Sequence, residues 1–349
     1  MKQISWISPV LIFSLLLAAG CQPPADDPAE PPSVTILQTG QTASIETEDD
    51  GYLQMGLDWP APRFTDNGDN TVTDNLTGLM WEQCPGNSTM DWAAALVYAN
   101  GLDLATHDDW RLPNINELES LCSSQESLNG TWLSSLELTD VQNNVYWSST
   151  TDAAATANAW YVDMSNTRLN SIDKSTDTVY VWAVRGITDK LMKTGQTTSY
   201  TAGDDGDLEQ GVAWPSPRFA DLGDGTIRDN LTGLIWQKAV DTTARNWAAS
   251  FTYARGLSFA SADDWRIPNK RELRSLIHYG VSNQVTCLAG FGFTDFDSEY
   301  YWTSTIYAQS TSKAFACSLT GATAGQEPGC LLNHERTSSA CTVLVRGGE

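Results

Sequence analysis

Apolar residues recur at helical spacing in two stretches of the chain, and each stretch occurs twice. Residues three or four positions apart share one face of a helix, and a glycine just past the last apolar residue ends the helix. The first stretch comprises Trp92, Leu96, Ala99 and Gly101, and it recurs as Trp247, Phe251, Ala254 and Gly256. The pattern predicts one amphipathic helix in each half of the chain.

A second helix is predicted after the motif Asp-Trp-Arg-Leu-Pro-Asn at 109–114, which recurs with Ile for Leu at 264–269. Asn followed three residues later by Glu is typical of a capping box. The two boxes are Asn114 with Glu117 and Asn269 with Glu272, and the apolar faces are Leu118, Leu121, Cys122 and Leu273, Leu276, Ile277. We expect both faces to be buried, and Arg111 and Arg266 to bind backbone carbonyls or a carboxylate rather than a substrate.

Strand patterns lie on both sides of these helices. Alternating or continuous apolar runs at 146–150, 159–164 and 179–185 predict strands late in the first half, and 301–305 repeats the first of them. Earlier strands are predicted on either side of Asp-, Asn- and Gly-rich turns. The sequence therefore predicts α+β domains, each with two helices and a small, mostly antiparallel sheet.

The repetition defines the domain organisation. Residues 40–159 align with 195–314 without a gap at an offset of 155 residues, and the final hairpin is six residues longer in the second repeat. We therefore predict five segments. They are a signal peptide at 1–20, an acidic Pro-rich tether at 21–37, a first domain at 38–187, a linker at 188–192 and a second domain at 193–349.

Composition and charge restrict the classes of molecule that the protein is expected to bind. Hydrophobic residues make up 41% of the chain and Trp occurs 14 times, enough apolar surface for two cores. The net charge of −23 repels phosphate backbones and sulfated polysaccharides. We therefore expect no nucleic-acid partner.

The N-terminus has the pattern of an export signal. Lys2 precedes an apolar run at 4–17, and Ala18-Ala19-Gly20 precedes Cys21. This end resembles the cleavage box of bacterial lipoproteins, which implies lipidation of Cys21 and anchoring in the outer membrane, on the periplasmic or the exposed side. An ordinary secretory signal cut nearby is the alternative.

Six cysteines remain besides Cys21, an even number that suits an oxidising compartment. Cys84 and Cys122 are both absent from the second repeat, where Ala239 and Ile277 replace them, so we predict a Cys84–Cys122 disulfide. The sequence leaves three pairings open among Cys287, Cys317, Cys330 and Cys341, with Cys317 and Cys341 expected in neighbouring strands.

Tryptophans are the candidates for ligand contact. Five matched pairs are expected in the core, since retention in both repeats favours packing: Trp59/214, Trp81/236, Trp92/247, Trp110/265 and Trp147/302. Trp132 and Trp160 have no Trp counterpart and are the predicted surface residues for ligand binding. We expect the ligand face in loops 123–145 or 278–300, where the repeats differ.

Metal and catalytic sites have weak support. Three carboxylates recur over nine residues in each repeat, as Asp66, Asp69, Asp74 and Asp221, Asp224, Asp229. They could bind calcium, but β-turn formation explains them better because the late Glu of an EF-hand loop is missing. The three histidines, His107, His278 and His334, are unmatched between repeats, so a duplicated triad or zinc site is excluded. We expect no cofactor and no enzymatic activity.

Several motifs together resemble the C-terminal domain family of the Lcl collagen-like adhesin. In the first repeat these are Phe-Thr-Asp-Asn-Gly-Asp at 64–69, Thr-Asp-Asn-Leu-Thr-Gly-Leu-Met-Trp at 73–81, Asp-Trp-Arg-Leu-Pro-Asn at 109–114, Tyr-Trp-Ser-Ser-Thr at 146–150 and Val-Arg-Gly at 184–186. The resemblance implies two tandem C-type-lectin-like domains, distantly similar to formylglycine-generating enzymes. It implies an adhesin-like module in the cell envelope that binds a glycan, or an envelope or host protein. A formylglycine-generating enzyme and a purely structural envelope component are the alternatives.

Overall fold

The computed structural model describes residues 33–86, 88–175, 179–296, 300–319 and 331–348. The predicted signal peptide, Cys21, most of the tether and Cys330 lie outside the described residues. Within these ranges no helix has the length and apolarity that crossing a membrane requires. The lipid anchor, the export route and the five segment boundaries stay predictions.

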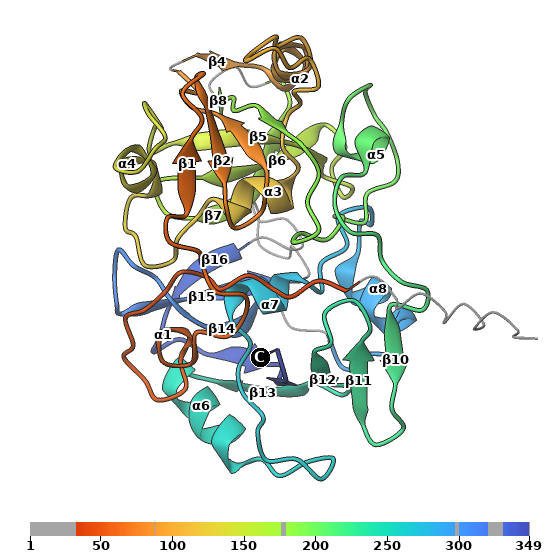
Figure 1. The fold of residues 1–349 in the computed structure, drawn as a ribbon. Helices are drawn as coiled ribbons and strands as arrows, with labels where there is room; N and C mark the ends of the chain where they lie inside the picture. Colours follow the sequence, from red (N-terminus) through yellow and green to blue (C-terminus); the bar gives the residue numbers. More distant parts are fainter. Residues whose placement is uncertain (1–32, 87, 176–178, 297–299, 320–330, 349) are drawn as a thin grey trace, which may run out of the picture. The chain divides into compact units, whose positions relative to one another are not determined.

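Each repeat contains four short helices in the described residues, at matched positions (Figure 1). They are α1 (Asp50–Leu53), α2 (Trp92–Asn100), α3 (Ile115–Ser120) and α4 (Asn129–Ser134), then α5 (Asp205–Leu208), α6 (Trp247–Gly256), α7 (Lys270–Arg274) and α8 (Gln284–Gly290). The two helices predicted in each repeat correspond to α2 and α3 and to α6 and α7. The other four helices were not predicted.

Two four-stranded sheets have the same order in the two repeats, β1-β2-β3-β9 and β10-β11-β12-β18. Their strands are β1 (Phe64–Asp66), β2 (Thr71–Asp74), β3 (Met80–Glu82), β9 (Val184–Arg185), β10 (Phe219–Asp221), β11 (Thr226–Asp229), β12 (Ile235–Gln237) and β18 (Val345–Arg346). All pairs in these sheets are antiparallel. The last strand of each repeat thus closes a sheet begun by the first.

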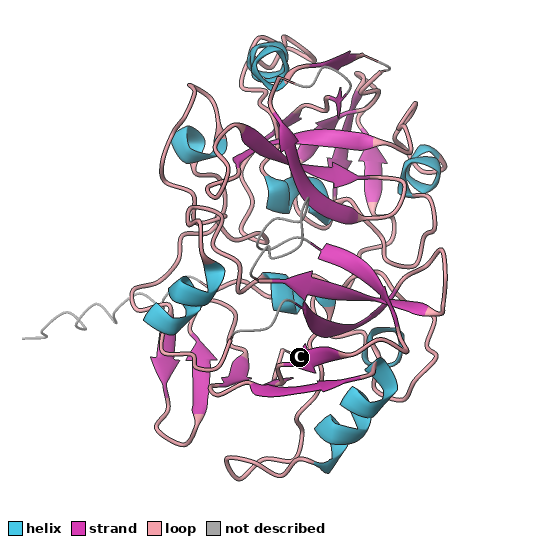
Figure 2. Cartoon of the chain, turned by 180° about the vertical axis from the view of Figure 1, so that it is seen from behind, coloured by secondary structure: helices cyan, strands magenta, loops and turns pink. Residues whose placement is uncertain are grey.

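A ten-stranded sheet joins the two repeats in the order β13-β17-β14-β15-β16-β7-β6-β5-β8-β4. Figure 2, coloured by secondary structure, shows the strands (magenta) and the short helices (cyan) of the chain. Its strands are β4 (Thr89–Met90), β5 (Val145–Thr151), β6 (Asn158–Asp163), β7 (Arg168–Asp173), β8 (Val179–Tyr180), β13 (Asp241–Arg245), β14 (Tyr300–Ile306), β15 (Lys313–Ser318), β16 (Leu331–Glu335) and β17 (Ala340–Thr342). The junction is the antiparallel pairing of Leu331 in β16 with Leu169 in β7. The predicted mixture of helices with mostly antiparallel sheet is confirmed, with β5–β8 and β14–β17 as parallel pairs.

The capping boxes position α3 and α7 as the sequence predicts. Asn114 Oδ1 accepts from Glu117 N at 3.0 Å, and a Glu117 carboxylate oxygen accepts from Asn114 N at 2.9 Å. Asn269 and Glu272 form the same box. The buried faces of both helices lie in the core with Leu118 and Leu273 fully buried, so this prediction is also confirmed.

The matched tryptophans are largely core residues, as predicted. Four of the five pairs are buried, namely Trp81/236, Trp92/247, Trp110/265 and Trp147/302. Trp59 and Trp214 are half-buried, and each lies against a guanidinium, Arg63 at 4.2 Å and Arg218 at 4.0 Å from the ring centroid.

The N-terminal segment of each repeat packs on the other repeat. Gln41 exchanges two hydrogen bonds of 2.9 Å with the backbone of Ile306, and Gln196 exchanges bonds of 3.0 and 2.8 Å with Thr151. Figure 1 shows α1 near the strands of the second repeat and α5 near those of the first. We call residues 34–58 and 189–213 the exchanged segments.

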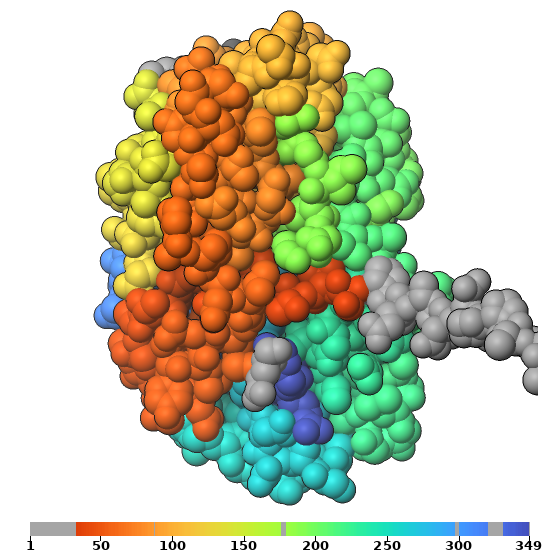
Figure 3. Space-filling model, in the orientation of Figure 1, coloured from red at the N-terminus to blue at the C-terminus, as the bar shows by residue number. Residues whose placement is uncertain are grey.

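Two matched carboxylates hold the exchanged segments in place. Asp50 accepts from Thr305 of β14 and Thr39 at 2.6 Å each, and Asp205 accepts from Thr150 of β5 at 2.8 Å and Thr194 at 2.7 Å. Both carboxylates are buried. In Figure 3 the first exchanged segment, red to orange, crosses between the two repeats. The sequence did not predict this arrangement.

The structure does not form the predicted Cys84–Cys122 disulfide. Cys84 is exposed, with its Sγ 3.9 Å from a carboxylate oxygen of Asp140, whereas Cys122 is buried with its Sγ 3.7 Å from the sulfur of Met164. Burial raises the pKa of the Cys122 thiol to about 12. Cys122 occupies the core position that Ile277 fills in the second repeat, so apolar packing accounts for both residues.

The strand order also corrects the expectation for Cys317 and Cys341. Both residues pair with Tyr301 of β14, one from each side, so β14 lies between their strands. Two strand spacings amount to about 10 Å, which exceeds the reach of a disulfide. These two cysteines therefore do not pair directly, and the remaining pairings involve Cys330, outside the described residues.

Candidate functional site

Two grooves lie at the Asp-Trp-Arg motifs, one in each repeat. The first groove has an open volume of about 450 Å³ and the second about 460 Å³. The first is lined by Asn100, Asp109, Trp110, Arg111, Gly186, Ile187, Gly203, Leu208 and Gln210, and the second by Glu48, Leu53, Arg255, Asp263, Asp264, Trp265 and Arg266. Six positions of the second groove match the first at the offset of 155 residues.

Each groove is built from both repeats. The motif supplies one wall, and the exchanged segment of the other repeat supplies the opposite wall, through Leu208 for the first groove and Leu53 for the second. Asn114 and Asn269 link these walls, since their side-chain amides donate to the backbone of Gln210 and Met55 at 3.2 Å. Ligand-sized pockets commonly occur at such junctions.

The arginine of each motif is structural, as the sequence predicts. Arg111 donates to both carboxylate oxygens of Glu117, at 2.6 and 2.7 Å, and to the carbonyl of Gly186 at 3.1 Å. Arg266 makes the same contacts with Glu272 and Gly347. These buried pairs connect the motif to the capping box and to the closing Val-Arg-Gly hairpin.

Acidic side chains lie at the rim of both grooves. Asp109 accepts a hydrogen bond from Arg185 at 2.6 Å, Asp264 forms an ion pair with Arg346 at 2.8 Å, and both carboxylates remain largely exposed. The hydrogen bond from Arg185 lowers the pKa of Asp109 below its usual range. A carboxylate with a lowered pKa, such as Asp109, can accept hydrogen bonds from a ligand but is a poor proton donor at neutral pH.

The grooves differ at two of the six matched pairs, Asn100/Arg255 and Gly203/Glu48. In the second groove, Arg255 donates to the carbonyl of Thr47 at 2.9 Å and pairs with Glu46 at 3.2 Å. In the first groove, Asn100 stands in its place, and its amide lies where a side chain on Gly203 would have to be. Gly203 has φ of +80°, which also favours glycine. The first groove is therefore less charged at this wall.

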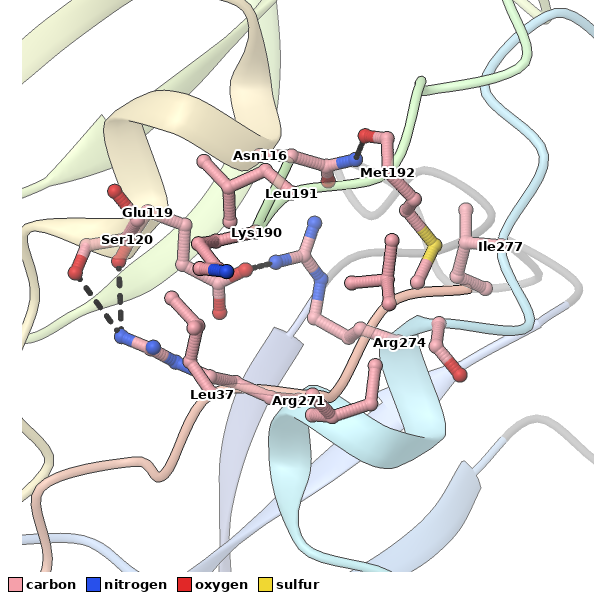
Figure 4. A pocket seen from close by; sticks show the side chains of 13 residues that line it. Leu37, Asn116, Glu119, Ser120, Lys190, Leu191, Met192, Arg271, Arg274 and Ile277 are labelled. Carbon is pink, nitrogen blue, oxygen red and sulfur yellow. Dashed lines mark hydrogen bonds and ion pairs between the residues drawn. The ribbon is translucent and has the colours of Figure 1, made fainter. Parts of the chain in front are cut away.

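A third hollow, the central pocket, lies between α3 and α7 (Figure 4). Its volume is about 60 Å³, and it is lined by Val34, Ile36, Leu37, Asn116, Glu119, Ser120, Lys190, Leu191, Met192, Arg271, Arg274, Ser275 and Ile277. Glu119 and Arg274 occupy matched positions and form an ion pair with each other. The pairing of matched residues places this pocket where the two repeats meet face to face.

The two predicted ligand-binding tryptophans differ in exposure. Trp132 is half-buried and packs on Trp59 with ring centroids 5.8 Å apart. Trp160 is 2% exposed and packs edge-on against Tyr279, at 5.3 Å. Trp160 is therefore a core residue between the repeats, and its prediction as a surface residue was wrong. Trp160 lacks a Trp counterpart in the second repeat, but it packs on Tyr279 of that repeat rather than facing solvent.

The six predicted calcium ligands serve turns and a buried ion pair in the structure. Asp66 and Asp69 accept from backbone N–H groups of Gly68 and Thr71, and Asp221 and Asp224 do the same in the second repeat. Asp74 and Asp229 are buried against Arg63 and Arg218. Within the described ranges, no three His, Cys, Asp or Glu side chains are placed to hold a metal ion.

The histidines lie in separate surroundings. His278 stacks edge-on against Trp214 at 4.8 Å, and His334 lies on Tyr300 at 4.2 Å. Burial lowers the pKa of both imidazoles. His107 lies in a two-residue bridge with Leu104.

The family follows from comparison with known sequence families. A model described as the Lcl C-terminal domain matches residues 70–185 and 225–346. The chain belongs to the Lcl C-terminal domain family. The match confirms the tandem arrangement, and both Lcl C-terminal domains contain the Asp-Trp-Arg motif and one wall of a groove. A search of curated proteins found no match.

The opposite walls of the grooves lie outside the matched ranges. Leu53 and Leu208 belong to the exchanged segments, upstream of each Lcl C-terminal domain match. Sequence reasoning missed these walls. The offset of 155 residues shows that the two exchanged segments correspond to each other, but it does not show that each one packs on the other repeat. The faithful repetition of the Asp-Trp-Arg motif was the available signal for the grooves.

Proposed function

We propose that this protein is an exported, outer-membrane lipoprotein whose paired grooves bind an extracellular glycan or protein ligand without catalysis. The observation that carries the proposal is the duplication of the groove, with near-equal volumes and six matched lining positions. Core packing is enough to explain why the Asp-Trp-Arg motif is buried. It does not require an open groove beside the motif at the same place in both repeats. The Lcl C-terminal domain family supports an adhesin-like role.

The chemistry of the grooves favours a neutral or cationic ligand. Asp109, Asp263 and Asp264 line them, and the chain carries a net charge of −23. A sulfated or phosphorylated polymer would be repelled. Carboxylates and backbone carbonyls at a rim are suitable acceptors for sugar hydroxyls or for lysine and arginine side chains of a protein.

Binding without chemistry is supported by the state of the groove side chains. The motif arginines are neutralised by Glu117 and Glu272, and the rim aspartates pair with Arg185 and Arg346. A general acid or base needs a pKa near neutrality in reach of a substrate.

We further propose a C-type-lectin-like fold for each domain, lipidation at Cys21 and no resident cofactor.

Blocking the grooves tests the proposal. Asp109→Trp and Asp264→Trp fill matched rim positions whose side chains are 56% and 55% exposed. Glycan-array binding and pull-down from envelope and host-cell fractions are measured for the parent, each variant and the double variant. We expect each substitution to weaken binding at least tenfold, with the largest loss in the double variant.

Matched controls separate blockage from unfolding. Val97→Trp and Thr252→Trp place the same side chain at another matched, exposed pair that lines neither groove. These variants should bind as the parent does. Ligand binding that survives the double groove variant, or the absence of any ligand in both assays, would contradict the proposal.

A further inference from the structure

The central pocket lies in an unusually cationic part of an acidic protein. Among the described residues that line it, Lys190, Arg271 and Arg274 are cations and Glu119 is an acid. Lys190 is exposed and pairs with Asp189. The buried charges beside the pocket therefore decide whether it prefers an anionic or a cationic ligand.

Three buried cations lie on one short helix beside the pocket, and two of them line it. Lys270, Arg271 and Arg274 of α7 are 0%, 8% and 5% exposed. Burial lowers the pKa of both Lys270 and Arg271. The matched residues of α3 are Ile115, Asn116 and Glu119, so this concentration of charge exists once in the molecule and not twice.

Most of the other charged side chains near this helix are already paired. Arg63 and Arg218 are neutralised by Asp74 and Asp229, and Arg266 by Glu272. Glu119 pairs with Arg274. Asp50 interacts with Lys270 at longer range, and burial raises its pKa to about 6. Among the described residues, Glu119 and Asp50 are the acids that interact with Lys270 and Arg271, and a buried charge is costly unless it is paired and hydrogen-bonded.

Arg271 has hydrogen-bonding capacity to spare. Its Nη2 donates to the carbonyls of Glu119, Ser120 and Cys122 at the end of α3, at 2.8 to 3.3 Å. Its Nε and Nη1 are buried and have no hydrogen-bond partner among the described residues. A buried donor without a partner is destabilising, so an acceptor bound here would stabilise the fold.

The pocket size and walls define the ligand further. A water molecule needs about 10–15 Å³ of such space, so a pocket of about 60 Å³ suits a ligand of four to six non-hydrogen atoms. Apolar side chains of Leu37, Leu191, Met192 and Ile277 form much of the wall (Figure 4). An inorganic anion would leave these walls unused.

We propose that the central pocket binds a small aliphatic monocarboxylate, of acetate to butyrate size, with its carboxylate toward Arg271 and its alkyl end on the apolar walls. The ligand bridges both repeats, because α3 and α7 and both exchanged segments line the pocket. Binding stabilises the folded chain by mass action. This site is separate from the grooves and does not rest on their proposed role.

Titration of the full chain with sodium propionate tests the site. Ionic strength is held constant with sodium chloride, and propionamide, which has the same shape without the charge, is titrated in parallel. We expect saturable binding of one propionate per chain by calorimetry and a rise in Tm, with at least tenfold weaker binding of propionamide. Equal effects of propionate and propionamide, or a chloride effect as large as that of propionate, would overturn the proposal.

Two variants locate the binding. Arg271→Asn installs the residue of the matched position 116, and Arg228→Thr installs that of position 73 on an exposed surface outside the pocket and both grooves. Arg271→Asn should weaken propionate binding at least tenfold, and Arg228→Thr should leave it unchanged. Undiminished binding in a folded Arg271→Asn variant would rule out the central pocket. Should that variant fail to fold, the propionate and propionamide titrations of the parent still decide.

Discussion

Asp50 and Asp205 show how single buried groups couple the two repeats to pH. Both carboxylates lie on exchanged segments and accept hydrogen bonds from threonines of the opposite repeat. Burial raises the pKa of Asp50 to about 6 and that of Asp205 to about 7, although the threonine hydrogen bonds act in the opposite direction. Because their pKa values lie near neutrality, these two carboxyl groups gain or lose their charge within the physiological pH range.

Raised carboxyl pKa values predict a loss of stability as pH increases. The folded chain keeps these protons whereas the unfolded chain releases them near pH 4, so this contribution to stability is fully present below about pH 4, falls as pH rises, and is lost once pH has passed about 6 for Asp50 and about 7 for Asp205. A rise from 3.8 to about 6 corresponds to at most about 3 kcal/mol. Asp50→Asn with Asp205→Asn should remove most of this dependence.

Urea unfolding at pH 5 and pH 8 checks this prediction. The parent chain should lose more unfolding free energy between these pH values than the double variant does. Asp189→Asn is the control, because its side chain is 80% exposed, and this variant should behave as the parent. Equal pH dependence in the parent and the double variant would show that the two carboxylates ionise normally.

At the scale of elements, sequence pattern was reliable wherever the determinants were local. The capping boxes, the α2 and α3 helices with their counterparts, and the buried face of α3 depend on residues within one or two turns of each other. The short α1 and α4 escaped prediction because each spans a turn or so and shows no apolar periodicity. The order β17-β14-β15 depends on a parallel pair that no local signal marks.

The candidate site was less predictable than the fold. The Asp-Trp-Arg motif looked purely structural, since Trp110 and Arg111 are buried and bonded within the domain. The groove beside the motif is formed only together with Leu208, which belongs to the other repeat. Trp160 misled for the same reason, because its partner Tyr279 is on the other repeat.

The capping asparagines serve two purposes, which predicts their cost when replaced. Asn269 caps α7 and donates to the Met55 carbonyl of the exchanged segment at 3.2 Å. Asn269→Ala should therefore cost about 2 kcal/mol, roughly 1 for the cap and 1 for the second hydrogen bond.

Asn246 provides the matched control, because it caps α6 through Ala249 N and no contact with the other repeat is found for its side chain in the described ranges. Asn246→Ala should cost about 1 kcal/mol. Chemical denaturation of both variants makes the comparison. Equal losses would mean that the contact between the repeats adds no stability.

At the scale of the whole molecule, the two repeats behave as one folded unit. The exchanged segments, the β7–β16 pairing and the Glu119–Arg274 pair each connect them. Residues 32–349 accordingly form one compact unit. The exchanged segments line both grooves and the central pocket, so the proposed ligand sites and the union of the repeats depend on the same segments.

Cleavage between the repeats tests this union most directly. A protease site inserted after Ile187, which is 84% exposed, allows the folded chain to be cut at the linker. Size-exclusion chromatography with light scattering then measures the mass in native buffer, and a denaturing gel confirms that the cut is complete. The exchanged segments predict a single species with the mass of the uncut chain. Separation into two independent, folded halves would contradict the account.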